Sequence, residues 1–226
     1  MNEYCEEAER TGGVLVGGLF KDEIETQIKA ALPDHPCDQS HRRGGVRNPQ
    51  FRYPCLLPAI DSPKIESLLG RKFRLIRTIM FDKTAGANWA VPWHQDRTIA
   101  VKEKREVDGF GPWSTKDGIP HVQPPLPILE KMVTLRIHFD DTGAENGALR
   151  IISESHKMGI LDTEAIARLG KTGEEIIFEA KAGDVLIMKP LVLHASHASA
   201  DPRHRRVLHL EYSDQLLPNG LDWTEA

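Results

Sequence analysis

The sequence is poor in cysteine and contains no long apolar run. Its cysteines are Cys5, Cys37 and Cys55. An odd number of cysteines without metal-type spacing argues against a disulfide framework and is typical of reduced thiols. No stretch approaches the length of a transmembrane helix, and the amino-terminal residues are acidic where a secretory signal is basic. We therefore expect a cytoplasmic protein without a membrane partner.

Positive charge is not in excess either. The 226 residues include 29 Lys and Arg against 33 Asp and Glu, which gives a formal net charge of −4. The sequence thus has no global basic field, and we expect no nucleic-acid partner. The length suits a single domain over residues 1–226 with a substantial core, and we expect a monomer or a homodimer.

A histidine and a carboxylate two positions apart are the first candidate site. On an extended segment, His94 and Asp96 project from the same face and can bind one metal ion. A third ligand, His194, stands near the end of a strand-like apolar run. Two histidines and one carboxylate make the facial triad of the non-haem iron oxygenases. The His-x-Asp pair by itself is a weak signal, because such histidines are more often packed or surface residues.

An arginine follows on the next strand-like run, over residues 204–212. Arg205 stands eleven positions after His194 (205 − 194 = 11), and a guanidinium fork suits a carboxylate. Alternation along this run does not decide whether Arg205 or Arg206 points inward. Both therefore stay open as carboxylate ligands on this ground.

Four motifs in order resemble the phytanoyl-CoA dioxygenase family. They are His94-Gln95-Asp96, residues 145–150 leading to 153–156, Gly183-Asp184 followed by residues 190–196, and Arg205. The resemblance covers the chain from about Phe73 to Tyr212. One departure is Ser-Glu-Ser-His at residues 153–156, where the family usually has Pro-Gly-Ser-His.

This resemblance implies an Fe(II)- and 2-oxoglutarate-dependent oxygenase that also uses O2. It implies His94, Asp96 and His194 as catalytic iron ligands. It also implies that Arg205 binds the distal carboxylate of 2-oxoglutarate and that Ser196 assists. Because Asp96 fills the position that a halide occupies in related halogenases, hydroxylation is favoured over halogenation. Desaturation or another oxidation remains an alternative.

Many short strands separated by turns, with a few early helices, predict a mainly β fold with flanking helices. We expect a double-stranded β-helix, the jelly-roll or cupin-like barrel, with its helices on one outer face. The expected helices cover residues 21–32, 61–70 and 161–169. The expected strands cover residues 14–20, 73–81, 131–141, 148–152, 175–180, 185–196 and 204–212. Asn146-Gly147 is a strong hairpin signal.

The run over residues 131–141 alternates between apolar and polar side chains. Val133, Leu135 and Ile137 share one face, and a polar face in such a barrel would line the ligand cavity. Thr134 and Arg136 on that face are therefore candidates for contacts to 2-oxoglutarate or substrate. The alternative is a half-exposed antiparallel strand with Arg136 in solvent.

Residues 97–127 form the least regular stretch and directly follow two candidate ligands. A long loop at this place predicts a lid over the substrate, although an ordinary surface loop is equally compatible. Phe110, Trp113 and His121 are its candidate substrate contacts; His121 as a metal ligand is discounted because the ligand set is complete without it. Further candidates before the metal pair are Arg77, Lys83 and Asn88.

The sequence therefore predicts a dioxygenase that hydroxylates a small molecule enclosed by the lid. The reaction would be coupled to oxidative decarboxylation of 2-oxoglutarate to succinate and CO2. The alternatives are a cupin-type metal-dependent enzyme and a jelly-roll binding module, neither of which uses 2-oxoglutarate. Fold and cofactor do not name the substrate.

Overall fold

Two facing β-sheets form the barrel of this protein. The computed structural model describes residues 2–33, 45–70, 72–200 and 203–224. Its strands are β1 (Gly13–Val16), β2 (Gly45–Arg47), β3 (Arg74–Lys83), β4 (Val91–His94), β5 (Ile99–Ala100), β6 (Trp113–Lys116), β7 (Ile119–Val122), β8 (Met132–His138), β9 (Leu149–Ile152), β10 (Glu175–Phe178), β11 (Val185–Met188), β12 (His194–Ser196) and β13 (Arg205–Ser213). Within the described residues they form a six-stranded sheet, β1-β11-β8-β13-β3-β2, a four-stranded sheet, β10-β9-β12-β4, and a three-stranded sheet, β5-β7-β6.

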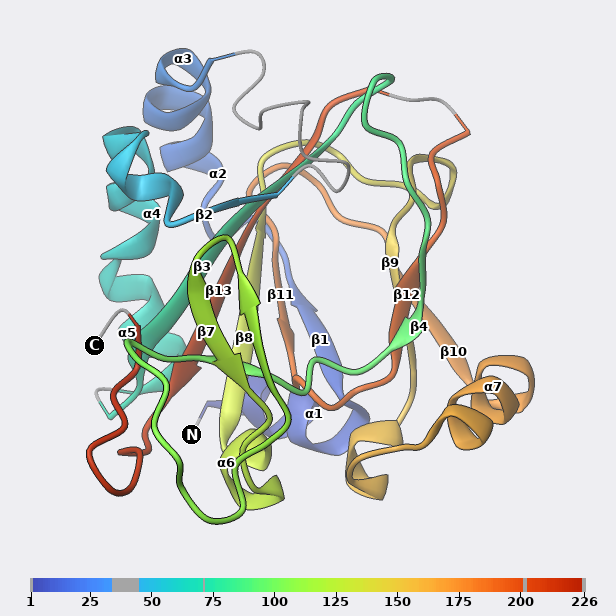
Figure 1. Cartoon of the computed structure of the whole chain (residues 1–226). Coiled ribbons are helices and arrows are strands. Elements are labelled where there is room, and N and C mark those ends of the chain that lie inside the picture. Colours follow the sequence, from blue (N-terminus) through green and yellow to red (C-terminus); the bar gives the residue numbers. More distant parts are fainter. Residues whose placement is uncertain (1, 34–44, 71, 201–202, 225–226) are drawn as a thin grey trace.

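The helices lie mostly on the outer side of the larger sheet (Figure 1). They are α1 (Glu3–Thr11), α2 (Lys21–Glu23), α3 (Lys29–Ala31), α4 (Leu57–Ile60), α5 (Pro63–Leu69), α6 (Leu126–Glu130) and α7 (Thr163–Thr172), with the π turn η1 (Ile24–Ile28) and the 3-10 turns η2 (Pro49–Phe51), η3 (Pro54–Leu56), η4 (Ala144–Asn146) and η5 (Ser155–Met158). In Figure 1, α2 to α5 cover one side of the six-stranded sheet, and the four-stranded sheet lies on its other side. The predicted jelly-roll barrel with helices on one outer face is confirmed.

The two faces of the six-stranded sheet differ in chemistry. Leu135, Ile137 and Leu208 pack with the helices in the main apolar cluster. Arg136 on the same strand points the other way and lines a cavity between the sheets. The predicted alternation of residues 131–141 is therefore confirmed, because a strand sends successive side chains to opposite faces. The barrel is apolar outside, under the helices, and polar inside.

The early helices follow their sequence signals. The helix predicted over residues 21–32 forms as α2, η1 and α3 in succession and ends before Pro33. At the start of α5, the Ser62 hydroxyl accepts a hydrogen bond from the Lys64 amide, and Gly70 follows the last turn. Helix α1 was not predicted, although Asn2 caps it and Gly12 ends it in the left-handed conformation.

Two predictions about the strands were wrong, because each assumed a connection between strands that the structure does not have. Residues 185–196 do not form one strand but two, β11 and β12, which belong to different sheets. The break falls at Pro190, which has no amide hydrogen to donate to a ladder. Asn146-Gly147 does not close a hairpin either, since β8 and β9 also lie in different sheets. Gly147 instead ends the turn η4 with φ +71° and leads the chain across the barrel.

The predicted lid over residues 97–127 is more regular than expected. It contains β5, β6 and β7, and the turn between β6 and β7 is Asp117-Gly118 with φ +52° and +78°. Positive φ at both central residues is the type I′ hairpin that Asp-Gly favours, so the sequence held a signal for this hairpin. None of the helices in the described ranges has the length and apolar character needed to cross a membrane.

Candidate active site

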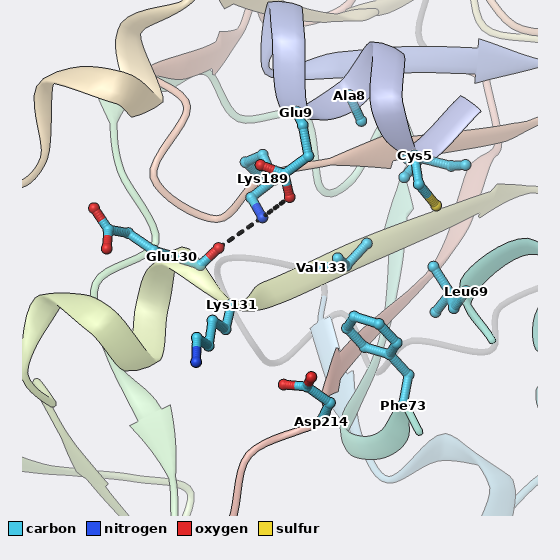
Figure 2. A pocket seen from close by; sticks show the side chains of 11 residues that line it. Cys5, Ala8, Glu9, Leu69, Phe73, Glu130, Lys131, Val133, Lys189 and Asp214 are labelled. Atoms are coloured by element: carbon cyan, nitrogen blue, oxygen red, sulfur yellow. Dashed lines mark hydrogen bonds and ion pairs between the residues drawn. The ribbon is translucent and has the colours of Figure 1, made fainter. Parts of the chain in front are cut away.

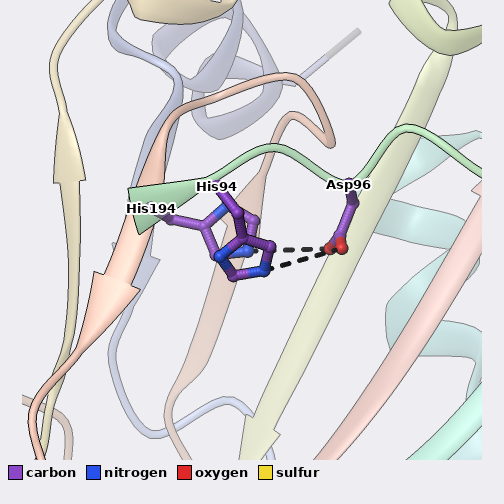
Figure 3. Close-up of side chains that lie close together, drawn as sticks. All are labelled: His94, Asp96 and His194. Atoms are coloured by element: carbon purple, nitrogen blue, oxygen red, sulfur yellow. Dashed lines mark ion pairs between the residues drawn. The ribbon is translucent and has the colours of Figure 1, made fainter. Parts of the chain in front are cut away.

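Strand pairing brings the three predicted metal ligands together. His194 in β12 lies directly opposite His94 in β4, so the two rings share one face of the four-stranded sheet. Their centroids are 4.1 Å apart. Asp96 follows β4, and its amide donates to the carbonyl of Pro190 at 3.0 Å, which turns the chain back over the site. Both imidazoles point at the Asp96 carboxylate in Figure 3.

Backbone contacts set the tautomer of both histidines. His94 Nδ1 lies 2.9 Å from the carbonyl of Pro92, and His194 Nδ1 lies 2.8 Å from that of Val192. A carbonyl only accepts, so each Nδ1 carries the hydrogen and each Nε2 keeps its lone pair. The two Nε2 atoms lie 3.9 and 3.7 Å from the Asp96 carboxylate oxygens.

The charge state of the cluster suits metal binding. Burial lowers the pKa of His194 to about 4, with a further contribution from His94, so the ring is neutral at pH 7. Burial opposes ionisation of Asp96, but His194 and His94 outweigh it and hold the pKa of this carboxyl below its usual range. The neutral ring of His194 and the carboxylate of Asp96 are therefore available to a metal ion without further proton loss.

The residue between two of the ligands locks their position. Gln95 is buried, and its amide nitrogen donates to the carbonyls of Gly159 at 2.8 Å and Leu191 at 2.7 Å. Its side-chain oxygen accepts from the amide of Leu161 at 2.8 Å. Because all three bonds go to other loops, Gln95 ties the ligand segment to the rest of the barrel. The sequence analysis missed this role.

The donor atoms fit an Fe(II) ion. One ligand atom from each of His94, Asp96 and His194 lies within 4.8 Å of the other two. This is the two-histidine, one-carboxylate set that binds Fe(II) with open positions. Asp96 with His209 and Glu211 also falls within this distance. In that second set, both ring nitrogens of His209 are already bonded, to Arg136 and to Glu211.

The ligands line a cavity of about 190 Å³ between the two sheets. Of the predicted residues, its wall contains His94, Asp96, His194, Ser196, Arg205, Arg77 and Arg136. The wall also contains residues that were not predicted, which are Phe81, Trp89, Val91, Leu149 and His209. His209 and Phe81 each follow a predicted residue of their strand, Arg205 and Arg77, by four positions. Period-two alternation could therefore have found these two.

Arg205 points into the barrel and Arg206 points out. Arg205 is 4% exposed and donates to the carbonyl of Gly147, while its Nε has no hydrogen-bond acceptor among the described residues. Burial, reinforced by Arg136, lowers the pKa of Arg205 to about 9, so it stays charged at neutral pH. Arg206 makes a two-pronged ion pair with Asp140 instead, at 2.8 and 2.7 Å.

Arg205 has two cationic neighbours. Burial, followed by Arg205 and Arg136, lowers the pKa of Lys83 to about 7. The Lys83 ammonium donates to Ser196 Oγ at 3.1 Å and to the carbonyl of His197 at 2.7 Å. Arg136 Nε, like Arg205 Nε, is buried and has no acceptor within the described chain. This end of the cavity therefore offers unmet donors to an anionic ligand.

A hydrogen-bonded chain links three strands across the floor of the site. Arg136 donates from Nη1 to His209 Nδ1 at 3.0 Å, and His209 Nε2 lies 3.1 Å from Glu211 Oε1. Since Arg136 can only donate, Nδ1 accepts and Nε2–H donates to Glu211. These contacts follow from the register, which places His209 opposite Arg136 and Glu211 opposite Arg77.

Several predicted contact residues do not reach the cavity wall. Asn88 forms two hydrogen bonds with the backbone of Ser199, at 2.9 and 2.7 Å. Phe110 and Trp113 pack against an apolar cluster in which Ile99 and Val122 of the hairpin meet barrel residues such as Met132. These side chains stabilise the hairpin rather than line the site.

Three further candidates are buried close to the cavity but outside its wall. Lys83 stands behind Ser196. His121 is fully buried, and its Nδ1 donates to the carbonyl of Ile119 at 2.9 Å. Burial lowers the pKa of His121 to about 4. Thr134 lies opposite Glu211 in the sheet.

A second cavity, of about 370 Å³, lies between α1 and the outer face of the large sheet (Figure 2). Its buried cation, Lys189, is already paired with Glu9 and donates to the carbonyl of Glu130 at 2.7 Å. The remaining wall is apolar or carries exposed charges. Nothing in this cavity resembles a metal or carboxylate site, so the chemistry belongs to the interior of the barrel.

Comparison with known proteins agrees with this site. A family model described as phytanoyl-CoA dioxygenase (PhyH) matches residues 55–206, about two thirds of the chain. A sequence search of curated proteins finds no match. The matched residues include all three candidate ligands and Arg205.

Solved structures share the fold at low sequence identity. The non-heme alpha ketoglutarate dependent epimerase SnoN from nogalamycin biosynthesis is 18% identical with a TM-score of 0.69, over 93% of this chain and 79% of SnoN. HygX from Streptomyces hygroscopicus, with nickel and 2-oxoglutarate bound, is 17% identical with a TM-score of 0.66, over 94% and 87%. EctD from S. alaskensis is 17% identical with a TM-score of 0.67, over 94% and 77%.

Proposed function

The chain belongs to the phytanoyl-CoA dioxygenase family, whose members use Fe(II), 2-oxoglutarate and O2, and from this premise we propose that it hydroxylates a small organic molecule. The proposed reaction converts 2-oxoglutarate to succinate and CO2. The observation that supports it best is the complete set of His94, Asp96 and His194 around one point of the cavity wall.

His94, Asp96 and His194 would hold the iron, which supplies the oxidising chemistry when bound. The chain's own task is to orient both imidazoles, which the carbonyls of Pro92 and Val192 do by holding each Nδ1–H. Gln95 ties the segment that carries His94 and Asp96 to the carbonyls of Gly159 and Leu191. Fixed ligand positions matter here, because a small displacement of the reacting groups lowers the reaction rate steeply.

Arg205 would bind the distal carboxylate of 2-oxoglutarate, with Ser196 beside it. The proposal is supported by the unmet Nε of Arg205 in the cavity wall. The guanidinium fork matches a carboxylate in two hydrogen bonds. Three apolar or aromatic wall residues, Phe81, Trp89 and Leu149, would exclude water from the same space.

Anaerobic titration with Fe(II) and 2-oxoglutarate tests the co-substrate site. We expect the weak visible charge-transfer band of an iron-chelated oxoglutarate to appear in the wild type. Arg205→Gln should weaken 2-oxoglutarate binding by roughly 30- to 150-fold, because a charge-assisted contact contributes about 2–3 kcal/mol. Arg206→Gln is the matched control and should leave binding unchanged, since Arg206 pairs with Asp140 outside the cavity.

Two results would contradict the assignment. An equal loss of 2-oxoglutarate affinity in both variants would mean that Arg205 supports the structure of the barrel and does not contact the co-substrate. Iron binding without the band would favour a cupin-type enzyme or a binding module. Hydroxylation itself is tested under ¹⁸O2 with a panel of small molecules: the product should gain one labelled oxygen with release of succinate. A product without new oxygen would point to another outcome, such as the epimerase activity named for SnoN.

A further inference from the structure

The positive charges around the barrel interior fall into two groups. The first is Arg205 with Arg136 and Lys83, whose charges perturb one another. The second group is Arg77 with Arg47 and Lys116. Partial loss of hydration lowers the pKa of Lys116, whose side chain stays partly exposed, and the charges of Arg77 and then Arg47 lower it further. The two groups contribute to the wall of one cavity and are joined through His209 and Glu211, which lie between Arg136 and Arg77.

Arg77 has a buried guanidinium with few partners. It lines the cavity that contains the candidate metal ligands, and its side chain is 12% exposed. Its Nε is buried and finds no acceptor in the described part of the chain. Among the described residues, its Nη1 makes only long contacts of 3.4 Å, to Glu211 Oε1 and to the carbonyl of Thr98. Glu211 Oε1 already accepts from His209 Nε2 at 3.1 Å.

Two more cations reach Arg77 from other elements. Arg47 in β2 lies opposite Ile79, which is two residues after Arg77 along β3. Arg47 donates from Nε to Asp117 at 2.7 Å, but its buried Nη1 has no acceptor among residues that the structure describes. Lys116 of the lid hairpin is exposed and donates to Thr98 Oγ1 at 3.2 Å. Arg77 and Lys116 thus both contact Thr98, and Arg47 pairs with Asp117, the residue after Lys116.

The charge balance of the site indicates that the group of Arg77, Arg47 and Lys116 binds an anion. Three arginines and one aspartate line the cavity, and Glu211 adds one negative charge behind His209. Fe(II) and the dianion of 2-oxoglutarate cancel each other, so the loaded site keeps an excess of positive charge. Burying an uncompensated charge is costly, and a bound anion removes that cost. The two carboxylates of 2-oxoglutarate are used by the metal and by Arg205.

We propose that the substrate is an organic acid and that Arg77 binds its carboxylate, with Arg47 and Lys116 adding positive potential beside it. This inference rests on the proposed function, because it assigns 2-oxoglutarate to Arg205. A guanidinium fork holds a carboxylate in one orientation. Arg77 would therefore fix which carbon of the substrate faces the metal ligands. Arg77 was predicted as a substrate contact, and the second cation group identifies the chemistry that it recognises.

Acetate is the probe that tests the Arg77 site. The protein is loaded with Zn(II), which replaces Fe(II) without turnover, and with saturating 2-oxoglutarate. Acetate is then titrated and followed by saturation-transfer NMR of its methyl protons. We expect saturable binding of acetate and at least tenfold weaker binding of acetamide, which has the same size and no charge.

Variants locate the binding. Arg77→Gln should weaken acetate binding at least tenfold, and Arg77→Lys, which keeps the charge but loses the fork, should give an intermediate value. Arg168→Gln removes an exposed arginine of α7 and should change nothing. Retained 2-oxoglutarate binding in Arg77→Gln, measured by calorimetry, shows that the barrel is intact.

The outcomes separate the two proposals. If 2-oxoglutarate binds but acetate does not saturate, or binds no better than acetamide, the organic-acid assignment is overturned while the proposed function stands. Saturable acetate binding that survives Arg77→Gln overturns the role of Arg77. If the metal-loaded wild type does not bind 2-oxoglutarate, the proposed function fails and this inference fails with it.

Discussion

At the scale of single residues, we expect Lys83 to couple co-substrate binding to pH. It is 1% exposed and bonded to Ser196, and burial together with Arg205 and Arg136 lowers its pKa to about 7. A dianion bound at Arg205 would add negative charge nearby and raise this pKa. The bound state would then hold a proton on Lys83 that the free protein loses above pH 7.

We therefore predict that 2-oxoglutarate binds most tightly below pH 7 and more weakly as the pH rises. The loss should reach at most about tenfold per pH unit until the raised pKa is passed. Calorimetry on the Zn(II) form from pH 6 to 9 measures the slope. Lys83→Met should flatten it, and an unchanged slope in that variant would show that another group takes up the proton.

At the scale of an element, the connection from η4 to β9 depends on a glycine. Gly147 has φ +71°, and a β-carbon there would lie 2.6 Å from the carbonyl oxygen of His197 and 3.2 Å from Lys83 Nζ. Gly118 in the turn between β6 and β7 has φ +78°, but nothing among the described residues lies within 4 Å of its β-carbon position. The two glycines therefore separate backbone strain from a steric clash.

Gly118→Ala should lower the free energy of unfolding by about 1 kcal/mol, the cost of an alanine in the left-handed region. Gly147→Ala should lower it by about 3 kcal/mol, because the carbonyl of His197 is backbone and cannot move aside freely. Urea unfolding of both variants measures the difference. Equal losses of unfolding free energy in the two variants would mean that the connection from η4 to β9 shifts enough to avoid the clash.

At the scale of the whole molecule, the barrel buries histidines in neutral form. Burial is the largest cause in each case: it lowers the pKa of His138 to about 3 and that of His121 and His194 to about 4. The ordinary value is about 6.5. Between pH 6.5 and these lowered values, the histidines are thus protonated in the unfolded chain but not in the folded chain.

The metal-free protein should consequently lose stability as the pH falls from 6.5 toward 4. Each of these histidines contributes up to about 2 kcal/mol between pH 6.5 and 5. Urea midpoints in the presence of a chelator measure the trend. His138→Asn should reduce the slope, whereas His197→Gln, at an exposed position, should not. A midpoint independent of pH over this range would contradict the buried neutral histidines.

The sequence by itself determined which residues of a strand share a face. Alternation put Val133, Leu135 and Ile137 on one face and Arg136 on the other, and the period of two put His94 and Asp96 on one face. Packing then set the first of these faces against the helices and turned Arg136 toward the cavity. These are local properties of an extended chain. The ordered motifs added the family, and with it the fold and the cofactors.

Only the tertiary structure decided which strands are neighbours. Residues 185–196 look continuous in sequence, yet β11 joins one sheet and β12 the other, which sets His194 opposite His94. The choice between Arg205 and Arg206 was likewise made by packing, through Asp140 on the outside. The meeting of Arg77 with Arg47 and Lys116 joins three distant segments. Register and sheet assignment are long-range choices governed by total burial, so local periodicity carries no record of them.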